Sequence, residues 1–305
     1  MEIRRLSYFV RIAEDGSLTR AAGLLRIAQS ALSRQMRLLE EELGTALFER
    51  TARGMRLTGE GTQLLASVAG PLRELELAIQ AVRTGPGAME ANLAIGLPPG
   101  MAELMATPLA VSLRAAFPNI RFRVVEGPTG GLVDWLARGM IDFALLEETA
   151  RNGLLEEQKL LSLPFLLVGP ADERGAPGAP VPLEEALARK LVVPSHHLGM
   201  RATIDDAAIR AQARLDIGFE ADAARLIRDL VQAGMGHALL PEPYARDAIA
   251  RGALTGRPIE DDALKLDIFL CLRRGSQTAG PRIGAVRQCV ARLAALHLAG
   301  RANSR

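Results

Sequence analysis

Residues 17–43 read SLTRAAGLLRIAQSALSRQMRLLEEEL, a pattern typical of two helices joined by a short turn. Ser17 can cap a first, short helix over about residues 18–25. A longer second helix over about residues 29–43 is predicted by apolar residues at helical spacing. These apolar residues are Leu32, Met36, Leu39 and Leu43.

The opposite face of the second helix is polar at its front end. Its residues are Gln29, Ser30, Ser33, Arg34 and Arg37. Arginine and glutamine can hydrogen-bond to base edges in pairs, while serine hydroxyls and helix N-terminal amides hold phosphates. The pattern therefore favours a DNA-binding helix-turn-helix, and a three-helix domain with a solvated face is the alternative.

The flanking residues extend this domain on both sides. Spacing predicts an amphipathic helix over residues 3–14, ahead of the motif. After it, two short extended pieces around Arg53 and Gly54 indicate a β-hairpin wing, whose arginines could reach phosphates or a minor groove. Thr58 can then cap a long helix that continues to about Arg83.

The apolar stripe of this long helix is too long for one small domain to cover. It consists of Leu64, Leu65, Val68, Leu72, Leu75, Ile79 and Val82. Pairing with the same helix of a second subunit would cover it and predicts a dimer. The alternative is a helix that lies across its own domain.

The ordered motifs LSYFV (6–10), GSLTRAA (16–22), AQSALSRQM (28–36), LLEEELG (38–44), LFER (47–50) and RLTGEG (56–61) strongly resemble the LysR-type transcriptional regulators. The resemblance implies an α/β multi-domain protein. It would have an N-terminal winged helix-turn-helix, a long linker helix, and a two-lobed effector domain like a periplasmic binding protein. The implied partners are an inverted-repeat operator in double-stranded DNA, a small-molecule effector, RNA polymerase, and further copies of the chain in a homodimer or homotetramer.

Carried over to this chain, the resemblance places Gln29, Ser30, Ser33, Arg34 and Arg37 against DNA from the recognition helix, with Arg53 in the wing. Two positions depart from the family pattern. Many members have Ser or Thr where this chain has Ala28, and many have Pro where it has Ser30. The helix therefore begins here without the usual cap.

The remaining two thirds alternate strand and helix patterns, which indicates a parallel α/β sheet. We expect residues 1–58 to form the DNA-binding domain, 59–88 the dimerising linker helix and hinge, and 89–305 the effector domain. Lobe 1 would comprise about 89–162 and 266–305, and lobe 2 about 163–265. Expected strands of lobe 1 are 93–97, 120–125, 141–146 and 266–272, and those of lobe 2 include 163–168 and 191–193. The chain would cross between the lobes near residues 161–163 and 264–266.

Ligands of open α/β sheets bind beyond the carboxyl ends of the strands, where helices begin. That rule selects Pro98, Pro99, Gly100, Met101, Thr129, Gly130, Glu147, Ser195, His196 and His197 as effector-binding residues. Backbone amides at these helix starts would suit an anionic effector, but Pro99 and Gly100 offer only amides where the family often places a Ser or Thr hydroxyl. Parts of this domain, GLPP (96–99), EGPTG (126–130) and VPS (193–195), resemble the nitrogen-assimilation-control branch of the family.

Two residue types with reactive side chains have structural interpretations. The adjacent His196 and His197 have no companion at metal-ligand spacing, so contact with effector or solvent is favoured over a metal site. Cys271 falls in an expected strand and Cys289 in an expected helix, so core thiols are favoured over a redox switch. We expect no metal and no cofactor.

Composition excludes several protein classes. The chain has 305 residues, 49% hydrophobic and 24% charged, with a net charge of +2, as in a folded globular protein. It begins without the apolar core of a signal peptide and has no membrane-length apolar run, so we expect a cytoplasmic protein. Nucleotide-binding, nucleophile-elbow and zinc-protease motifs do not occur, which argues against an enzyme. The N-terminal motif argues against a solute-binding protein.

Overall fold

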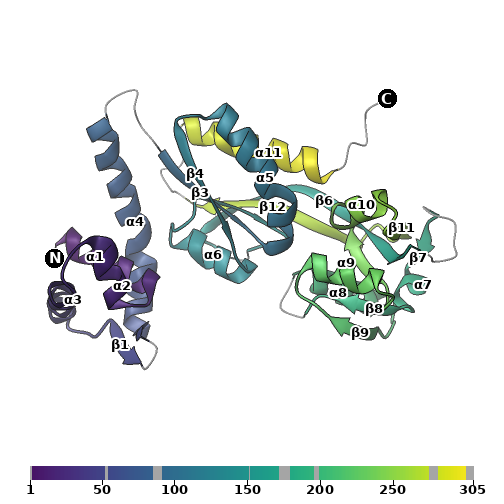
Figure 1. Ribbon diagram of the computed structural model, residues 1–305, viewed down its shortest axis with the longest axis horizontal. Helices are drawn as coiled ribbons and strands as arrows, with labels where there is room; N and C mark the ends of the chain where they lie inside the picture. The colour runs from purple at the N-terminus through teal and green to yellow at the C-terminus, as the bar shows by residue number, and fades with distance from the viewer. Residues whose placement is uncertain are drawn as a thin grey trace. The chain divides into compact units, whose positions relative to one another are not determined.

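The computed structural model describes residues 2–51, 54–84, 91–150, 152–171, 179–195, 199–274 and 281–299. The chain divides into two compact units (Figure 1). The first comprises Met1–Leu93 with the short segments Asn119–Arg121 and Asp134–Asp142, and the second holds the remainder.

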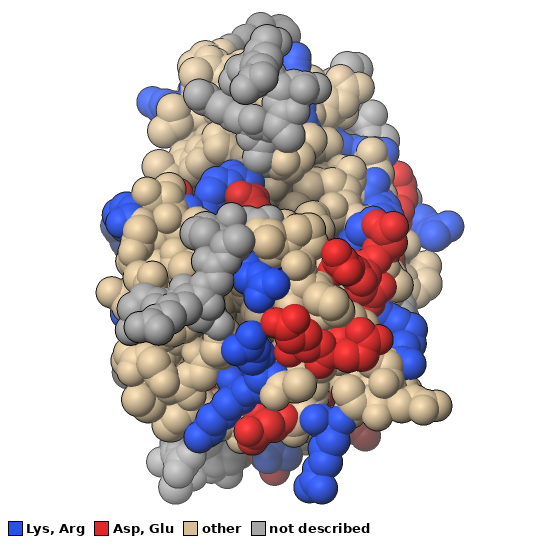
Figure 2. All heavy atoms as spheres, turned by 90° about the vertical axis from the view of Figure 1, so that its right-hand side faces the viewer, with Lys and Arg blue, Asp and Glu red and all other residues tan. Residues whose placement is uncertain are grey.

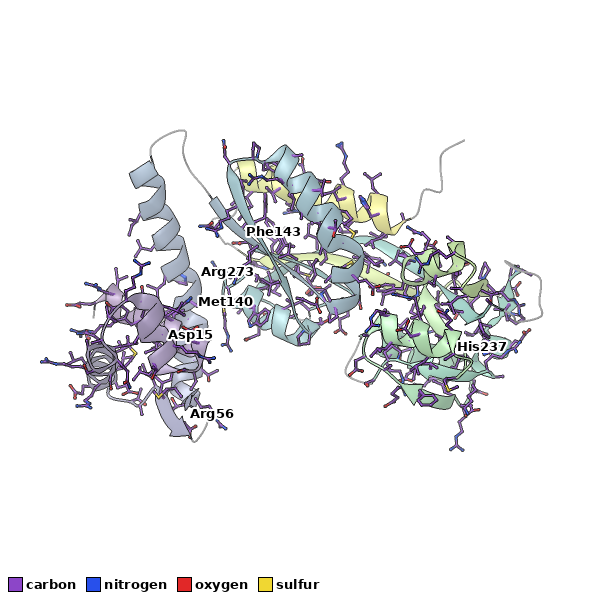
Figure 3. All side chains as sticks on the ribbon, in the orientation of Figure 1. Asp15, Arg56, Met140, Phe143, His237 and Arg273 are labelled. Carbon is purple, nitrogen blue, oxygen red and sulfur yellow. The ribbon has the colours of Figure 1, made fainter. Side chains whose placement is uncertain are left out.

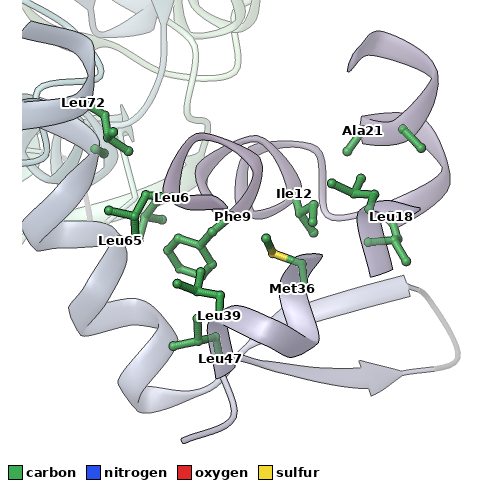
Figure 4. Packing of buried hydrophobic residues seen from close by; sticks show 13 residues of the cluster. Leu6, Phe9, Ile12, Leu18, Ala21, Met36, Leu39, Leu47, Leu65 and Leu72 are labelled. Carbon is green, nitrogen blue, oxygen red and sulfur yellow. The ribbon is translucent and has the colours of Figure 1, made fainter. Parts of the chain in front are cut away.

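The N-terminal part of the first unit is a helical domain with a hairpin. Its elements are α1 (Ile3–Asp15), α2 (Leu18–Leu25), α3 (Gln29–Leu43), β1 (Phe48–Thr51), β2 (Gly54–Leu57) and α4 (Gly59–Thr84). Figure 4 shows Phe9 and Ile12 of α1 facing Met36 and Leu39 of α3 across the core. Phe9, Ile12 and Leu39 are fully buried. The predicted helix-turn-helix and hairpin are therefore confirmed as structural elements.

Local hydrogen bonds explain where these helices begin and end. The Ser17 hydroxyl accepts from the backbone N–H of Arg20 at 3.4 Å, as the sequence predicts. Ala28 gives α3 no side-chain cap. The turn between α2 and α3 begins at Arg26, which adopts a left-handed φ of 55°. Thr58 caps α4, because its Oγ1 accepts from the Gly61 N–H at 2.9 Å.

Helix α4 shows one of the two arrangements considered from the sequence over its first half, and the pairing of two copies stays a prediction. Leu65, Ala69 and Leu72 are buried in the core of the helical domain, so the first half of α4 covers its own domain. Leu75 and Ile79, farther along, are 37% and 45% exposed. The apolar stripe therefore continues past the core that could cover it.

The second unit is built on a mixed sheet with strand order β4-β3-β5-β12-β6-β11-β7. The strands of its first half are β3 (Ala91–Leu97), β4 (Ile120–Glu126), β5 (Phe143–Leu146), β6 (Leu155–Pro170) and β12 (Lys265–Arg273). The parallel arrangement expected from the sequence is present between β3 and β5, whereas β12 runs antiparallel to β5 and β6 because the chain returns from the second half of the unit. Helices α5 (Pro99–Ala116) and α11 (Pro281–Leu298) pack against each other (Figure 1).

The second half contains several elements that the sequence analysis missed. Strands β10 (Ala238–Pro241) and β11 (Leu254–Glu260) pair with β6, and β8 (Lys190–Val193) pairs with β9 (Asp216–Glu220) in a separate sheet. The remaining elements are β7 (Val181–Pro182), α6 (Thr129–Ala137), α7 (Leu183–Leu187), α8 (Gly199–Arg210), α9 (Ala224–Gln232) and α10 (Glu242–Ala250). Strands β9 and β11 and helices α7 and α10 are the missed elements.

Strand β6 links the two halves. The sequence predicted a strand over residues 163–168, whereas β6 has 16 residues. It pairs with β12 from Leu155 to Pro164 and with β11 from Leu166 to Pro170. The expected lobe boundary at residues 162/163 therefore falls inside one continuous strand.

None of the helices in the described part of the chain is long and apolar enough to cross a membrane.

Candidate DNA interface and ligand cavity

The outward face of α3 carries the polar residues selected from the sequence. Gln29, Ser30, Arg34 and Arg37 are exposed and Ser33 is half-buried. The buried residues Leu32, Met36 and Leu39 hold the opposite side of α3 on the core. Since the buried stripe fixes the rotation of the helix, the polar stripe faces outward as a set.

Charged residues of α3 also fix its position. The Glu40 carboxylate accepts from the backbone N–H groups of Leu47 and Phe48 at 2.8 and 3.2 Å, which ties α3 to the start of β1. Arg5 of α1 donates to Glu42 at 3.0 Å and to Gln35 at 3.2 Å. The carboxylates near the C-terminal end of α3 therefore hold the helix in place, and the polar stripe lies toward its N-terminal end.

The hairpin lies beside the helix-turn-helix. Strands β1 and β2 are antiparallel, and the Met55 N–H donates to the Gly16 carbonyl at 3.1 Å. Arg56 of β2 (Figure 3) is 76% exposed and lies 3.6 Å from Glu49. Arg53, selected as the wing contact, lies outside the described residues. On the face of the second unit that Figure 2 shows, basic and acidic side chains are intermixed, unlike the stripe of α3.

A cavity lies inside the second unit, where several helices begin. It is lined by Pro98, Pro99, Gly100, Pro128, Thr129, Glu147, Pro194, Gly199, Met200, Asp222, Ala224, Ile227 and Tyr244. These residues come from the starts of α5, α6, α8 and α9, from the end of β5, and from α10. The space amounts to about 520 Å³ when its open mouth is counted.

Glu147 and Tyr244 form the polar centre of the cavity. The Tyr244 hydroxyl donates to Glu147 Oε1. Burial raises the pKa of Glu147, and the nearby charge of Glu148 raises it further, against the lowering effect of the tyrosine hydrogen bond. Burial, together with the charges of Glu147 and Glu103, also raises the pKa of Tyr244. Glu147 is therefore harder to ionise than a solvated glutamate, and a cation bound beside it would favour its ionised form.

The walls of the cavity are held by close packing and two arginines. A Cβ at Gly100 would lie 2.6 Å from the Tyr244 ring, so a side chain at this position would require the ring to move. Arg228 of α9 donates to the Tyr244 carbonyl at 2.7 Å and pairs with Glu103 of α5. Arg201, only 3% exposed, donates to the Pro194 carbonyl at 3.0 Å.

The structure brings together half of the predicted effector residues. Pro98, Pro99, Gly100, Thr129 and Glu147 line the cavity. Three others do not line it. The Met101 side chain is fully buried because it turns into the core. Gly130 follows the helix start and is exposed, and the Ser195 N–H donates to Asp222 at 3.3 Å beside the cavity. His196 and His197 lie outside the described residues.

Two ionisable residues of the cavity were missed from the sequence. Asp222 follows β9, and Tyr244 lies in the first turn of α10. The rule that ligands gather where strands end would have selected Asp222 if β9 had been recognised. Nothing in the local pattern marks Tyr244, because its place depends on the long-range pairing of β10 with β6.

One of the two cysteines lies in the core of the second unit. Cys271 is buried, and burial together with the charge of Glu157 raises the pKa of its thiol to about 12. A thiol of this kind is a poor nucleophile at neutral pH. Groups of three or more potential metal ligands do not occur among the described residues.

Comparisons with known proteins identify both domains. A family model for the LysR substrate binding domain matches residues 86–295, and one for a bacterial regulatory helix-turn-helix protein of the lysR family matches residues 3–62. The nitrogen assimilation regulatory protein nac of Escherichia coli (strain K12) is 35% identical over 257 residues, which cover 84% of this chain and 83% of that protein.

Solved structures share the fold. Full-length OxyR of Pseudomonas aeruginosa, determined as a variant, has a TM-score of 0.80 at 24% identity, covering 96% of this chain and 95% of that one. Full-length CbnR in complex with its target DNA has a TM-score of 0.65 at 21% identity, covering 96% and 99%. The chain therefore belongs to the LysR family of DNA-binding transcriptional regulators, with an N-terminal helix-turn-helix domain and a C-terminal substrate-binding domain like that of periplasmic binding proteins.

Proposed function

We propose that this regulator recognises its operator through the outward stripe of α3, made of Gln29, Ser30, Ser33, Arg34 and Arg37, with Arg53 in the wing. The observation that carries the proposal is that α3 presents these side chains together while its buried face fixes its rotation. Arg34 is the best placed to read a guanine, since its guanidinium can make two parallel hydrogen bonds in the major groove. The uncapped amides at the start of α3 suit a phosphate.

The proposal extends to assembly and control. The exposed Leu75 and Ile79 on α4 support pairing of two copies through this helix. Two copies would present two α3 helices to an inverted repeat in the cytoplasm, where bacterial DNA lies, and a homotetramer would join two such dimers. A small molecule in the cavity of the second unit would change the relative stability of two arrangements of the domain and thereby alter contacts to DNA and RNA polymerase.

Fluorescence anisotropy against DNA from upstream of the gene, with a scrambled duplex as competitor, tests this reading. Arg34→Ala should weaken specific binding by about 1–3 kcal/mol, or about 5- to 150-fold, and leave binding to the scrambled duplex nearly unchanged. The matched control is Arg225→Ala, which removes an exposed arginine of α9 in the other unit. Equal losses on both duplexes would assign Arg34 to phosphate binding instead of base reading.

A further inference from the structure

The ionisable side chains that line the cavity are all acidic or phenolic. They are Glu147, Asp222 and Tyr244. No lysine or arginine occurs among the described lining residues. An anionic ligand would therefore meet no formal positive charge from these residues, whereas a cation would meet two carboxylates.

The nearest arginines do not supply the missing charge. Arg228 donates to the Tyr244 carbonyl and to Glu103, and Arg201 donates to the Pro194 carbonyl, to Asp205 and to Glu220. Both guanidinium groups are thus engaged with carboxylates and backbone carbonyls of the protein. They hold the walls of the cavity in place, and the side chains that can carry a charge inside it are acidic or phenolic.

The partial positive charges at the helix N-termini do not make the cavity favourable for an anionic ligand. Helix N-termini carry a partial positive charge that favours anions, and four helices begin at the cavity. The protein places its own carboxylates near these ends: Asp222 lies two residues before α9, and Glu148 would lie 3.0 Å from a Cβ at Gly199, where α8 begins. A carboxylate ligand would meet like charge there, contrary to the expectation from the sequence.

We propose that the cavity binds a small molecule through a protonated primary amine, with the carboxylates of Glu147 and Asp222 as acceptors. The inference rests on the proposed function, in which this cavity is the effector site. An ammonium group has three donors, and a carboxylate with one partner retains further acceptor positions. Among the described residues, Glu147 has one hydrogen bond, to Tyr244.

The remaining lining limits the rest of the ligand. Pro98, Met200 and Ile227 offer apolar contact beside the acids. The ligand expected from this lining is therefore a small amine whose carbon chain packs on these apolar side chains.

Ligand-observed saturation-transfer NMR on the full-length protein tests the charge preference with probes of nearly equal size. The probes are n-propylammonium, n-propanol and propionate. We expect n-propylammonium to bind, n-propanol to bind more weakly, and propionate not to bind. Glu147→Gln and Asp222→Asn should each weaken the ammonium probe by about tenfold or more, as expected for loss of a charge-assisted hydrogen bond.

Asp262→Asn is the matched control, because this fully exposed aspartate pairs with Lys265 and does not line the cavity. Propionate binding without ammonium binding would overturn the inference and leave the effector site in place. Ammonium binding of equal strength in both cavity variants would place the probe elsewhere and overturn it as well. Failure of all three probes would also overturn it, while the DNA-binding assay with Arg34→Ala decides the proposed function independently.

Discussion

Replacing Gly61 by alanine tests how the long helix α4 is seated on the hairpin. An added Cβ would lie 2.1 Å from the Leu47 carbonyl oxygen. Carbon–oxygen contacts of this kind are normally about 3.3–3.6 Å, so the backbone must separate by more than about 1 Å. The same carbonyl accepts from the Thr58 N–H at 3.0 Å, and that bond would be strained by the movement.

The size of the effect follows from three contributions. An extra methyl group in a packed site costs about 1–3 kcal/mol, and loss of one hydrogen bond adds about 0.5–1.5 kcal/mol. Alanine regains about 0.5–1 kcal/mol over glycine inside a helix. We therefore expect Gly61→Ala to destabilise the helical domain by about 2 kcal/mol, which corresponds to about 30-fold faster exchange of its protected amides.

Hydrogen-exchange mass spectrometry on the full-length protein measures this difference in peptides from α1 and α3. Gly23→Ala in α2 is the matched control, since a Cβ there meets nothing within 4 Å. That variant should exchange at the same rate as the wild type or more slowly. Wild-type exchange in Gly61→Ala would refute the claim that the contact with Leu47 requires glycine.

Three further predictions concern protonation, thiol reactivity and backbone strain. Burial raises the pKa of Glu147 above 4.5, so the folded state holds this proton more tightly and stability is lost as pH rises through the raised value; the Tm advantage of Glu147→Gln over the wild type should grow as pH rises from 4.5 through the raised pKa and then level off, and a difference that does not change with pH would contradict this. Because the pKa of Cys271 is about 12, a maleimide at about pH 8 should leave the native Cys289→Ser variant unlabelled and modify it only after denaturation. Arg26→Gly should stabilise the helical domain by about 1 kcal/mol in urea unfolding, since it removes a left-handed φ of 55° from an arginine; a destabilised variant would show that the Arg26 side chain contributes more than the strain costs.

The helical domain could be predicted from sequence because its signals are local. Ser17 and Gly44 mark helix ends within a few residues of the apolar stripes that they terminate. The predicted helices over residues 18–25 and 29–43 therefore coincide with α2 and α3. The hairpin wing could also be predicted from local signals, because its two short strands are neighbours in sequence.

The second unit was predicted less completely because its elements are defined by distant pairing. Strand β9 is mostly exposed, and its apolar alternation is limited to Ile217 and Phe219 on either side of Gly218, which is too short a pattern to distinguish it from a loop. Tyr244 reaches the cavity only because β10 pairs with β6 across more than 70 residues of chain. Of the ionisable residues that line the cavity, Glu147 was therefore selected from the sequence, whereas Asp222 and Tyr244, which come from these two regions, were not.

The continuity of strand β6 has a mechanical consequence. One segment of chain serves as an edge-to-edge partner for β12 over its first ten residues and for β11 over its last five. Two paired strands resist stretching, since elongation would break several backbone hydrogen bonds at once, but they twist at low energetic cost. The register shift beside Ile268 and Phe269 is the natural place for such a twist. The two halves of the unit are thus joined by continuous paired strands, and we expect rotation about the strand axis to break fewer backbone hydrogen bonds than separation of the halves.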